Sequence, residues 1–411
     1  MKVIQVKPIL AALKHHKAGT ILIALQIALT LAIVCNALFI IQQRLAHMSQ
    51  STGIDEANLL VIQNGWVGKP SAAEAGSLLA ADLATLRRVP GVVDTYATNA
   101  WPLSEGGDVF GVGLTPDKLA SIASTAIYYS DEHTLATMGL KLVAGRNFHA
   151  DEVSQIKSDQ VKPAEVIITK ALAEHMFPNS SALGKMIYIS AKPSTIIGVV
   201  ARMQGPWVDS FAAKWADFST LVPYQLLGSR GSNYIVRTAP GRRDEVVRSA
   251  PKALFAANPM RVINHKNGVQ TYAEIRSAAY KSDRGMAILM SVICVMLLAV
   301  TGAGIVGLSS FWVGQRRKQI GIRRALGATK NDILSYFLTE NLMISSGGAT
   351  LGIVFAFVIN LWLMRQFEMD RLAPGYLMAG VIAVLLLGQC AALMPALRAS
   401  RVPPVEATRS V

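Results

Sequence analysis

The sequence has 411 residues, of which 52% are hydrophobic and 16% charged, and its formal net charge is +14. It exceeds the length of one ordinary domain, and its apolar content is typical of a membrane protein rather than a soluble enzyme. The basic excess is dispersed over segments that flank apolar runs, which excludes a nucleic-acid-binding protein, whose cations gather in one patch.

The chain begins with a basic segment and a first apolar run. Residues 1–19 contain four lysines and no acidic residue. Residues 20–43 follow without a charge and are predicted to form transmembrane helix 1, because they are long enough to cross the hydrocarbon core. A cleaved signal peptide is disfavoured, since the run is too long and no small-residue cleavage site follows it.

Small or polar residues recur every four positions along this first run. We expect them to line one face that packs closely on another helix and contributes to a dimer, as small residues do in membranes. They are Ala24, Ala28, Ala32 and Asn36. Asn36 has a second interpretation, a polar site for cargo, but a hydrogen bond between helices is favoured.

Residues 44–284 have the composition of a separate domain, with charges of both signs, prolines, glycines and no run long enough to span. Strand-like and helix-like patterns alternate in it, which predicts a large α+β domain between transmembrane helices 1 and 2. The predicted strands are 58–62, 166–169, 186–189, 195–200 and 234–237, and the predicted helices are 78–88, 170–176 and 242–257.

Three further apolar runs predict transmembrane helices 2, 3 and 4 at residues 285–314, 331–364 and 374–397. The second helix exceeds the thickness of the hydrocarbon core, so we expect it to tilt or to extend outward. Gly348 and Gly352 form a GxxxG pair in the third, which indicates close helix packing. The short connection between the last two makes them an antiparallel hairpin.

Residues 315–330, between the second and third spans, form the most basic short segment. Ile322, Ala325 and Leu326 are spaced to share one side of a short helix, with arginines and a lysine around them. Gly327 is placed as its C-terminal cap, and Thr329 with Asp332 predicts a capping box for the next helix. The segment suits docking onto a cytoplasmic partner, or its cations only anchor the spans on the inner side.

The topology follows from the distribution of charge. Residues 1–19, 315–330 and 398–411 hold thirteen of the 40 Lys and Arg residues, against only Asp332, Glu340 and Glu406 among the acidic residues near them. Short basic loops stay in the cytoplasm, so both termini are predicted inside and the large domain outside.

The sequence lacks the motifs of several kinds of catalytic, metal and disulfide sites. The three cysteines lie within predicted spans, which gives neither a disulfide framework nor a zinc ligand set, and HExxH and GxSxG are absent. The sequence also contains no GxxxxGK[ST] P-loop, so we expect no catalytic residue, metal or cofactor in this chain and ATP hydrolysis in a partner.

Four stretches together resemble the MacB/FtsX-type ABC transporter permeases. They are IGIRRALGATKNDI (320–333) with Glu340 and Asn341, the C-terminal stretch 395–407, LATMGLKLVAGRNFHADE (135–152), and VIITKALAEHMFPNSSALGKMIYI with IIGVV (166–189, 196–200). The family often has an acidic residue where Gln319 stands, so one charge contact to an ATPase is in doubt.

The resemblance implies a permease of the bacterial inner membrane that transmits ATP-driven movement to a periplasmic domain of two lobes, a βαβ-type lobe interrupted by a strand-rich insert near 115–215. It implies two copies of an ABC ATPase, which bind ATP and Mg, and a second permease chain, as homodimer or heterodimer. It also implies efflux through a periplasmic adaptor and an outer-membrane channel. The implied ATPase-coupling residues are Gln319, Ile320, Gly321, Ile322, Arg323, Arg324, Ala325, Leu326 and Gly327.

An alternative within the same resemblance is a module similar to LolCE or FtsX, which moves a lipoprotein or regulates a cell-wall hydrolase. A set of aromatic residues with a loose four-residue spacing is relevant to this alternative. Trp207, Phe211, Trp215 and Phe218 are interpreted as core residues first, with contact to a lipidated or protein partner, or to the bilayer surface, as the alternatives.

Overall fold

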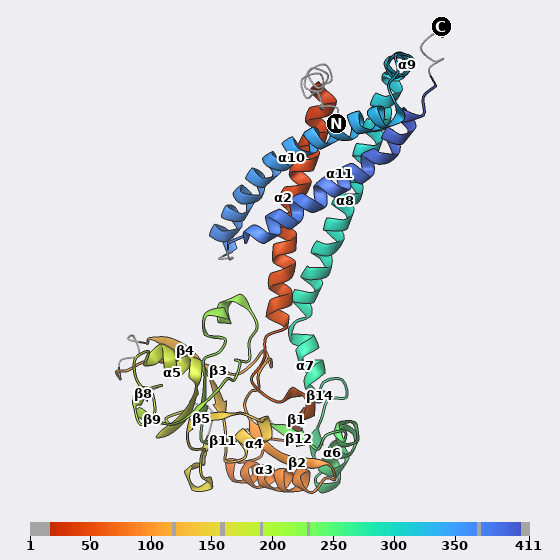
Figure 1. Ribbon diagram of the computed structural model, residues 1–411. Coiled ribbons are helices and arrows are strands. Elements are labelled where there is room, and N and C mark those ends of the chain that lie inside the picture. Colours follow the sequence, from red (N-terminus) through yellow and green to blue (C-terminus); the bar gives the residue numbers. More distant parts are fainter. Residues whose placement is uncertain are drawn as a thin grey trace. The chain divides into compact units, whose positions relative to one another are not determined.

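The structure is a computed structural model that describes residues 17–116, 121–156, 161–189, 192–227, 231–367 and 371–403. The predicted N-terminal segment up to residue 16 and Glu406 of the predicted C-terminal tail lie outside these residues. The chain divides into a helical unit, Met1–Ser49 with Ser282–Val411, and an α/β unit, Gln50–Lys281 (Figure 1). The residues predicted at the edges of the external domain, 44–49 and 282–284, therefore belong to the helical unit.

Among the described residues, four helices are long and apolar enough to cross a membrane. They are α2 (Lys17–Met48), α8 (Lys281–Gln315), α10 (Lys330–Phe367) and α11 (Pro374–Ser400). The predicted class, a membrane protein with four transmembrane helices and a large α+β domain between the first two, is confirmed. All four helices extend beyond the predicted spans because backbone hydrogen bonding continues past the first polar residues.

α2 forms the centre of the helical unit, where α10 and α11 both pack against it (Figure 1). Its buried side chains include Ile27 and Leu31, which belong to an apolar cluster shared with α10 and α11. α8 contacts α2 through the hydroxyls of Thr30 and Thr301, whose oxygens lie 2.7 Å apart. Most of the apolar surface of α8 is exposed, and Val295 and Val300 are 67% and 63% exposed.

The outer ends of α2 and α8 are joined by charge. The carboxylate of Asp283 accepts a hydrogen bond from Arg44 at 2.7 Å and lies 2.8 Å from Nδ1 of His47. The Asp283 side chain is only 10% exposed, so the cost of burying its carboxylate is offset by these two partners. This cluster was not predicted from the sequence, although charged residues at the ends of two neighbouring spans are a recognisable signal.

The α/β unit contains two main sheets. The first has the strand order β13-β1-β12-β2, with β14 also pairing with β1. β12 is antiparallel to both β1 and β2, so β1, α3 and β2 form a split βαβ unit, as do β12, α6 and β13. The bounds are β1 (Leu59–Trp66), α3 (Ala72–Arg87), β2 (Val92–Thr98), β12 (Gly231–Thr238), α6 (Arg243–Ala257), β13 (Arg261–Val262) and β14 (Val269–Thr271).

A buried ion pair lies in this first lobe. Arg261 donates to both carboxylate oxygens of Asp82, at 2.9 and 2.8 Å, and the hydroxyl of Tyr234 donates to the same carboxylate at 2.6 Å. The two charged side chains are 0% and 2% exposed, and the two-pronged geometry compensates their lost hydration. The pair ties α3 to the edge strand β13.

The second sheet has the order β3-β4-β10-β7-β9-β5, with β8 pairing with β9, and a separate ribbon joins β11 to β6. Its strands are β3 (Asp108–Val112), β4 (Ala123–Tyr129), β5 (Leu142–Gly145), β6 (Ser154–Ile156), β7 (Glu165–Thr169), β8 (Met186–Tyr188), β9 (Pro193–Val200), β10 (Ser219–Val222) and β11 (Tyr224–Leu226). The helix α5 (Lys170–Met176) packs on β7 and β9.

The second lobe is inserted between β2 and β12 of the first, as expected, but its limits differ from the predicted 115–215. It extends from β3 to β11, because β3 and β10 both pair with β4 and lie outside the predicted range. The insertion is also not continuous, since the short helix α4 (Thr134–Met138) packs against β2 and β12 of the first lobe. The helix α7 (Tyr272–Ala279) follows β14 and leads into α8.

Candidate functional site

The candidate site is the short helix α9 (Arg317–Ala325), which connects α8 to α10. Gly327 ends it with a φ of +98°, and its N–H donates to the carbonyl of Arg324 at 3.1 Å. Thr329 and Asp332 then exchange hydrogen bonds, from the Thr329 N–H at 2.9 Å and from the Asp332 N–H at 3.2 Å. The predicted glycine cap and capping box are both confirmed.

One face of α9 is packed on the membrane helices. Ile320 is 4% exposed and lies in an apolar cluster with side chains from all three neighbouring spans. The cluster is completed by Val313 of α8, Ile333 of α10, and Ala399 and Val402 at the end of α11. Gly321 is buried beside Ile320. A displacement of α9 would therefore also displace α8, α10 and α11.

The opposite face is apolar and is not covered by any of the described residues. Ile322 is 44% exposed and Leu326 is 83% exposed, and Ala325, which was expected on the same side, is exposed as well. Gln319 is exposed one turn earlier. Two large apolar side chains in solvent at one short helix are a candidate contact surface for another protein.

Two of the arginines expected around this face point inward instead. Arg316 is buried and donates to both oxygens of Glu340 at 3.0 Å. Arg324 donates to the carbonyls of Ser400 and Val402, at 3.2 and 2.8 Å. The expectation that these two cations surround a docking face is wrong, because the carboxylate and the free carbonyls at the end of α11 offer them closer partners.

Arg323 lies on the exposed side but also contacts its own chain. Its guanidinium is 4.9 Å from the centre of the Tyr336 ring, a cation–π distance. Arg317 and Lys318 are exposed on the first turn of α9. Lys318 and Arg323 therefore place positive charge on the exposed side of α9, beside Ile322.

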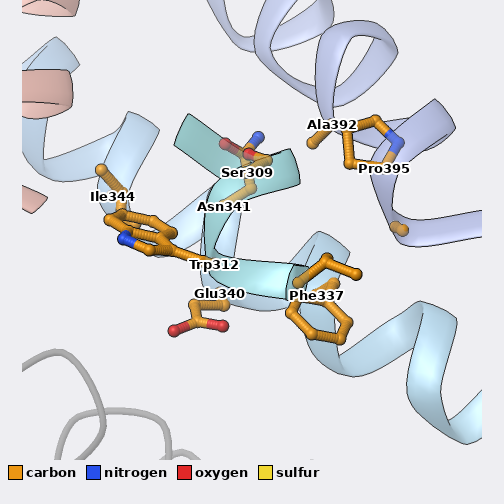
Figure 2. A pocket seen from close by; sticks show the side chains of 10 residues that line it. Ser309, Trp312, Phe337, Glu340, Asn341, Ile344, Ala392 and Pro395 are labelled. Atoms are coloured by element: carbon orange, nitrogen blue, oxygen red, sulfur yellow. The ribbon is translucent and has the colours of Figure 1, made fainter. Parts of the chain in front are cut away.

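Beneath α9, the three spans enclose a small pocket of about 20 Å³ (Figure 2). It is lined by Ser309, Trp312 and Val313 of α8, by Phe337, Glu340, Asn341 and Ile344 of α10, and by Ala392, Pro395 and Ala396 of α11. The Asn341 amide donates to the carbonyl of Gly388 at 2.9 Å, which ties α10 to α11. Such a volume suits about one water molecule and no larger ligand, so the junction is a packed joint rather than a substrate site.

The predicted packing residues meet within the chain. A Cβ atom added to Gly348 would lie 2.7 Å from the carbonyl oxygen of Ala24, and one added to Gly352 would lie 2.9 Å from that of Ala28. The Asn36 amide donates to the carbonyls of Ala32 and Ala356, at 2.9 and 3.2 Å. Asn36 therefore links α2 to α10 and is not open to cargo.

The same burial corrects the expected dimer contact of span 1. Ala28 and Ala32 are 0% exposed because α10 of the same chain covers them. At Ala28 and Ala32 this face has no surface left for a second chain, whereas Ala24 is partly exposed. Among the described ranges, no group of three or more His, Cys, Asp or Glu residues is placed to hold a metal ion.

The fold and this joint define a membrane permease with a large extracytoplasmic domain. Residues 20–253 match the MacB-like periplasmic core domain, and residues 291–404 match the FtsX-like permease C-terminal domain. The first match covers more than half of the chain. This chain belongs to the MacB-like family of ABC transporter permeases.

Two similar proteins are longer than this chain. It is 25% identical over 412 residues to the macrolide export ATP-binding/permease protein MacB of Shewanella sp. (strain W3-18-1), covering 98% of this chain and 60% of the relative. It is 27% identical over 317 residues to the protein of the same name from Neisseria gonorrhoeae, covering 76% and 47%. The chain thus spans 60% or less of the length of these relatives.

Solved structures of similar external domains also exist. The periplasmic region of MacB from Actinobacillus actinomycetemcomitans is 17% identical, with a TM-score of 0.35 over 57% of this chain and 97% of that one. The extracellular domain of the transporter YknZ from Gram-positive bacteria is 17% identical, with a TM-score of 0.32, and covers 51% of this chain and 98% of that one.

Proposed function

We propose that this chain transmits the movement of an ABC ATPase across the inner membrane, and that α9 is the part the ATPase contacts. The observation that carries the proposal is the exposed apolar pair on α9, Ile322 and Leu326, opposite the face that packs on the spans. An exposed apolar pair beside an exposed lysine, Lys318, is suited to a groove on a protein partner.

The joint beneath α9 is suited to passing that movement on. α9 is held to α8, α10 and α11 by the apolar cluster around Ile320 and by Arg324 at the end of α11. At the same junction, Arg316 is paired with Glu340. Packed cores of this kind shift as units rather than deforming gradually, so a push on α9 displaces the inner ends of all three spans.

The family also supports a proposal for the wider assembly. Two ATPase copies, which hold ATP and Mg, would act on two permease chains, as homodimer or heterodimer, with both termini in the cytoplasm and the α/β unit in the periplasm. Both relatives described above are macrolide export proteins by name, which supports export of a small molecule. A periplasmic adaptor and an outer-membrane channel would complete the path.

The test is a pair of charge variants in vesicles that contain the permease and its ABC ATPase. Leu326→Asp places a charge on the proposed contact without touching the joint, because Leu326 is 83% exposed. We expect ATP-driven export to fall about tenfold or more, since losing a buried leucine contact costs about 1.5–3 kcal/mol.

Asn331→Asp is the matched control, because it adds the same charge at an exposed position at the start of α10. We expect this variant to retain export. Arg324 is a poor choice for the test, since its loss would free the end of α11 and weaken the joint itself. Full export by Leu326→Asp, with the chain folded and in the membrane, would refute the role of α9.

A further inference from the structure

The first lobe of the α/β unit contains an open pocket of about 590 Å³, which shares no residue with the joint beneath α9. All the residues that line it belong to this one lobe. Its apolar wall is formed by Trp66 and Val67 at the end of β1, Leu78 of α3, and Met260 just before β13. Pockets of about 300–1,000 Å³ hold drug-sized molecules, so this volume suits a small organic ligand.

The aromatic part of the wall is held in place by the buried ion pair of the lobe. Trp66 is 7% exposed, and the guanidinium of Arg261 lies 5.4 Å from the centre of its ring. Arg261 is itself fixed by its two hydrogen bonds to Asp82. A side chain that is already ordered loses little conformational entropy when a ligand packs on it, which favours binding.

The part of the wall around Met260 is fixed through the backbone. The N–H of Val67 donates to the carbonyl of Met260 at 3.2 Å, and the N–H of Met260 donates to Oδ1 of Asn258 at 2.9 Å. The side chains of Met260 and Val67 nevertheless stay in solvent, with these residues 57% and 48% exposed. A ligand in the pocket would therefore remove apolar surface from water.

The polar groups that remain available around the pocket are hydrogen-bond donors. Lys69 is exposed, and its ammonium has no partner among the described residues. The indole N–H of Trp66 is buried and finds no acceptor in the same part of the chain. Because Oδ1 of Asn258 accepts from Met260, the amide N–H groups of Asn258 are left to a ligand.

The side-chain acceptor with a charge is already engaged. Glu74 lines the pocket, but its Oε2 accepts from the N–H of Ser71 at 2.7 Å in the capping box of α3. The positive end of the α3 dipole also offsets this negative charge. A ligand that brings acceptor oxygens and a negative charge therefore complements the pocket better than a cation does.

We propose that this pocket binds a small apolar molecule with one anionic group, such as an aryl or acyl carboxylate or sulfonate. The apolar body would lie against Trp66, Leu78 and Met260, and the anionic group would accept a charge-assisted hydrogen bond from Lys69. This binding would be a property of the α/β unit, independent of the contact between α9 and an ATPase.

The test is protection of an introduced cysteine from a maleimide, in the full chain in lipid nanodiscs. Cys35, Cys294 and Cys390 are first replaced by alanine, and Ala73→Cys places a thiol at an exposed position that lines the pocket. The probe is anilinonaphthalene sulfonate, which has apolar rings and one negative charge. We expect a saturating amount to slow labelling at position 73 several-fold.

Ala84→Cys is the matched control, because Ala84 is exposed on the same face of α3, about 16 Å further along the helix. Its labelling should not change with the probe. Phenylnaphthylamine has the same rings without the sulfonate, and we expect it to protect position 73 only at about tenfold higher concentration. Lys69→Met removes the charge and keeps an apolar side chain, so it should weaken protection by the sulfonate about tenfold and leave that by the neutral compound unchanged.

Absence of protection at position 73, or equal protection at 73 and 84, would overturn the proposal. Equal protection by the charged and neutral compounds would overturn the anionic class of ligand, as would full protection by the sulfonate in Lys69→Met. Labelling at 73 that is already much slower than at 84 without any compound would show that a protein partner or a second copy covers the pocket. That result would overturn the proposal too.

Discussion

At the scale of the residue, Asp131 is a buried acid whose hydrogen-bond partners lie in its own turn. It is 2% exposed and accepts hydrogen bonds from the N–H of His133 at 3.0 Å and from the hydroxyl of Thr134 at 3.2 Å. Burial, followed by the negative charge of Glu132, raises the pKa of Asp131 to about 6. These two effects outweigh the hydrogen bonds, which act in the opposite direction.

The raised pKa predicts how Asp131→Asn changes stability with pH. The folded chain keeps its proton while the unfolded chain, with a pKa of about 4, loses it, so stability falls as the pH rises from about 4 to about 6. Asparagine cannot ionise, so we expect the variant to gain up to about 3 kcal/mol at pH 8 and nothing at pH 3. Urea unfolding of the solubilised chain, followed by tryptophan fluorescence at several pH values, measures this difference.

The control for this prediction is Asp244→Asn, because the side chain of Asp244 is 78% exposed at the start of α6. We expect no comparable change in its pH dependence. A gain for Asp131→Asn that is the same at pH 3 and pH 8 would show that the carboxyl is not the titrating group.

At the scale of the element, the contact between α2 and α10 depends on which of two adjacent glycines faces α2. A Cβ atom added to Gly348 meets the Ala24 carbonyl at 2.7 Å and Ile27 at 2.9 Å, whereas one added to Gly347 meets nothing within 4 Å. An alanine at position 348 would therefore require the backbones of α2 and α10 to move apart. A Cβ atom at position 347 points away from α2.

We therefore predict opposite results from the same substitution at neighbouring positions. Gly348→Ala should destabilise the helical unit by about 1–3 kcal/mol, since it overpacks the interface. Gly347→Ala should be neutral or stabilising by up to about 1 kcal/mol, because alanine favours helix over glycine. Thermal unfolding in detergent measures both, and equal midpoints would contradict this packing of α2 on α10.

The elements themselves show where sequence patterns succeed. The helix predicted at 170–176 has the bounds of α5, because its apolar residues repeat at helical spacing directly after a strand. The strands β2 to β6, β10, β11, β13 and β14 were not predicted. β10 is four residues long and buried throughout, so it shows no alternation of apolar and polar residues, and it is a strand because β4 and β7 pair with it on either side.

At the scale of the whole molecule, the proposed function requires the spans to move relative to one another. α2 and α8 are joined in mid-span by Thr30 and Thr301, which are 3% and 1% exposed and have their hydroxyl oxygens 2.7 Å apart. Cysteines at both positions should bring two sulfur atoms within bonding reach. A disulfide there would tie the span before the α/β unit to the span after it.

We predict that Thr30→Cys with Thr301→Cys, in a chain without its native cysteines, loses ATP-driven export on oxidation and regains it on reduction. Thiol counting by mass spectrometry confirms the bond, and Thr30→Cys alone is the control that oxidation should not affect. If the oxidised chain exports at the full rate, α2 and α8 move as one body. The transmitted movement would then have to run through α10 and α11.

The four spans, the capped short helix and the family were all open to prediction from the sequence alone. A run of twenty or more apolar residues has one stable environment, and a glycine cap or capping box depends only on residues a few positions apart. The candidate face on α9 followed in the same way, from the spacing of Ile322, Ala325 and Leu326.

The partners of buried side chains were decided only by the tertiary structure. The small-residue face of α2, expected to contribute to a dimer, is filled by Gly348 and Gly352 of the same chain, and Arg324, expected to face an ATPase, holds the end of α11. Hydrophobicity and caps are properties of a local stretch. Which neighbour fills a small-residue face or satisfies a buried charge depends on how helices far apart in the sequence come to lie side by side.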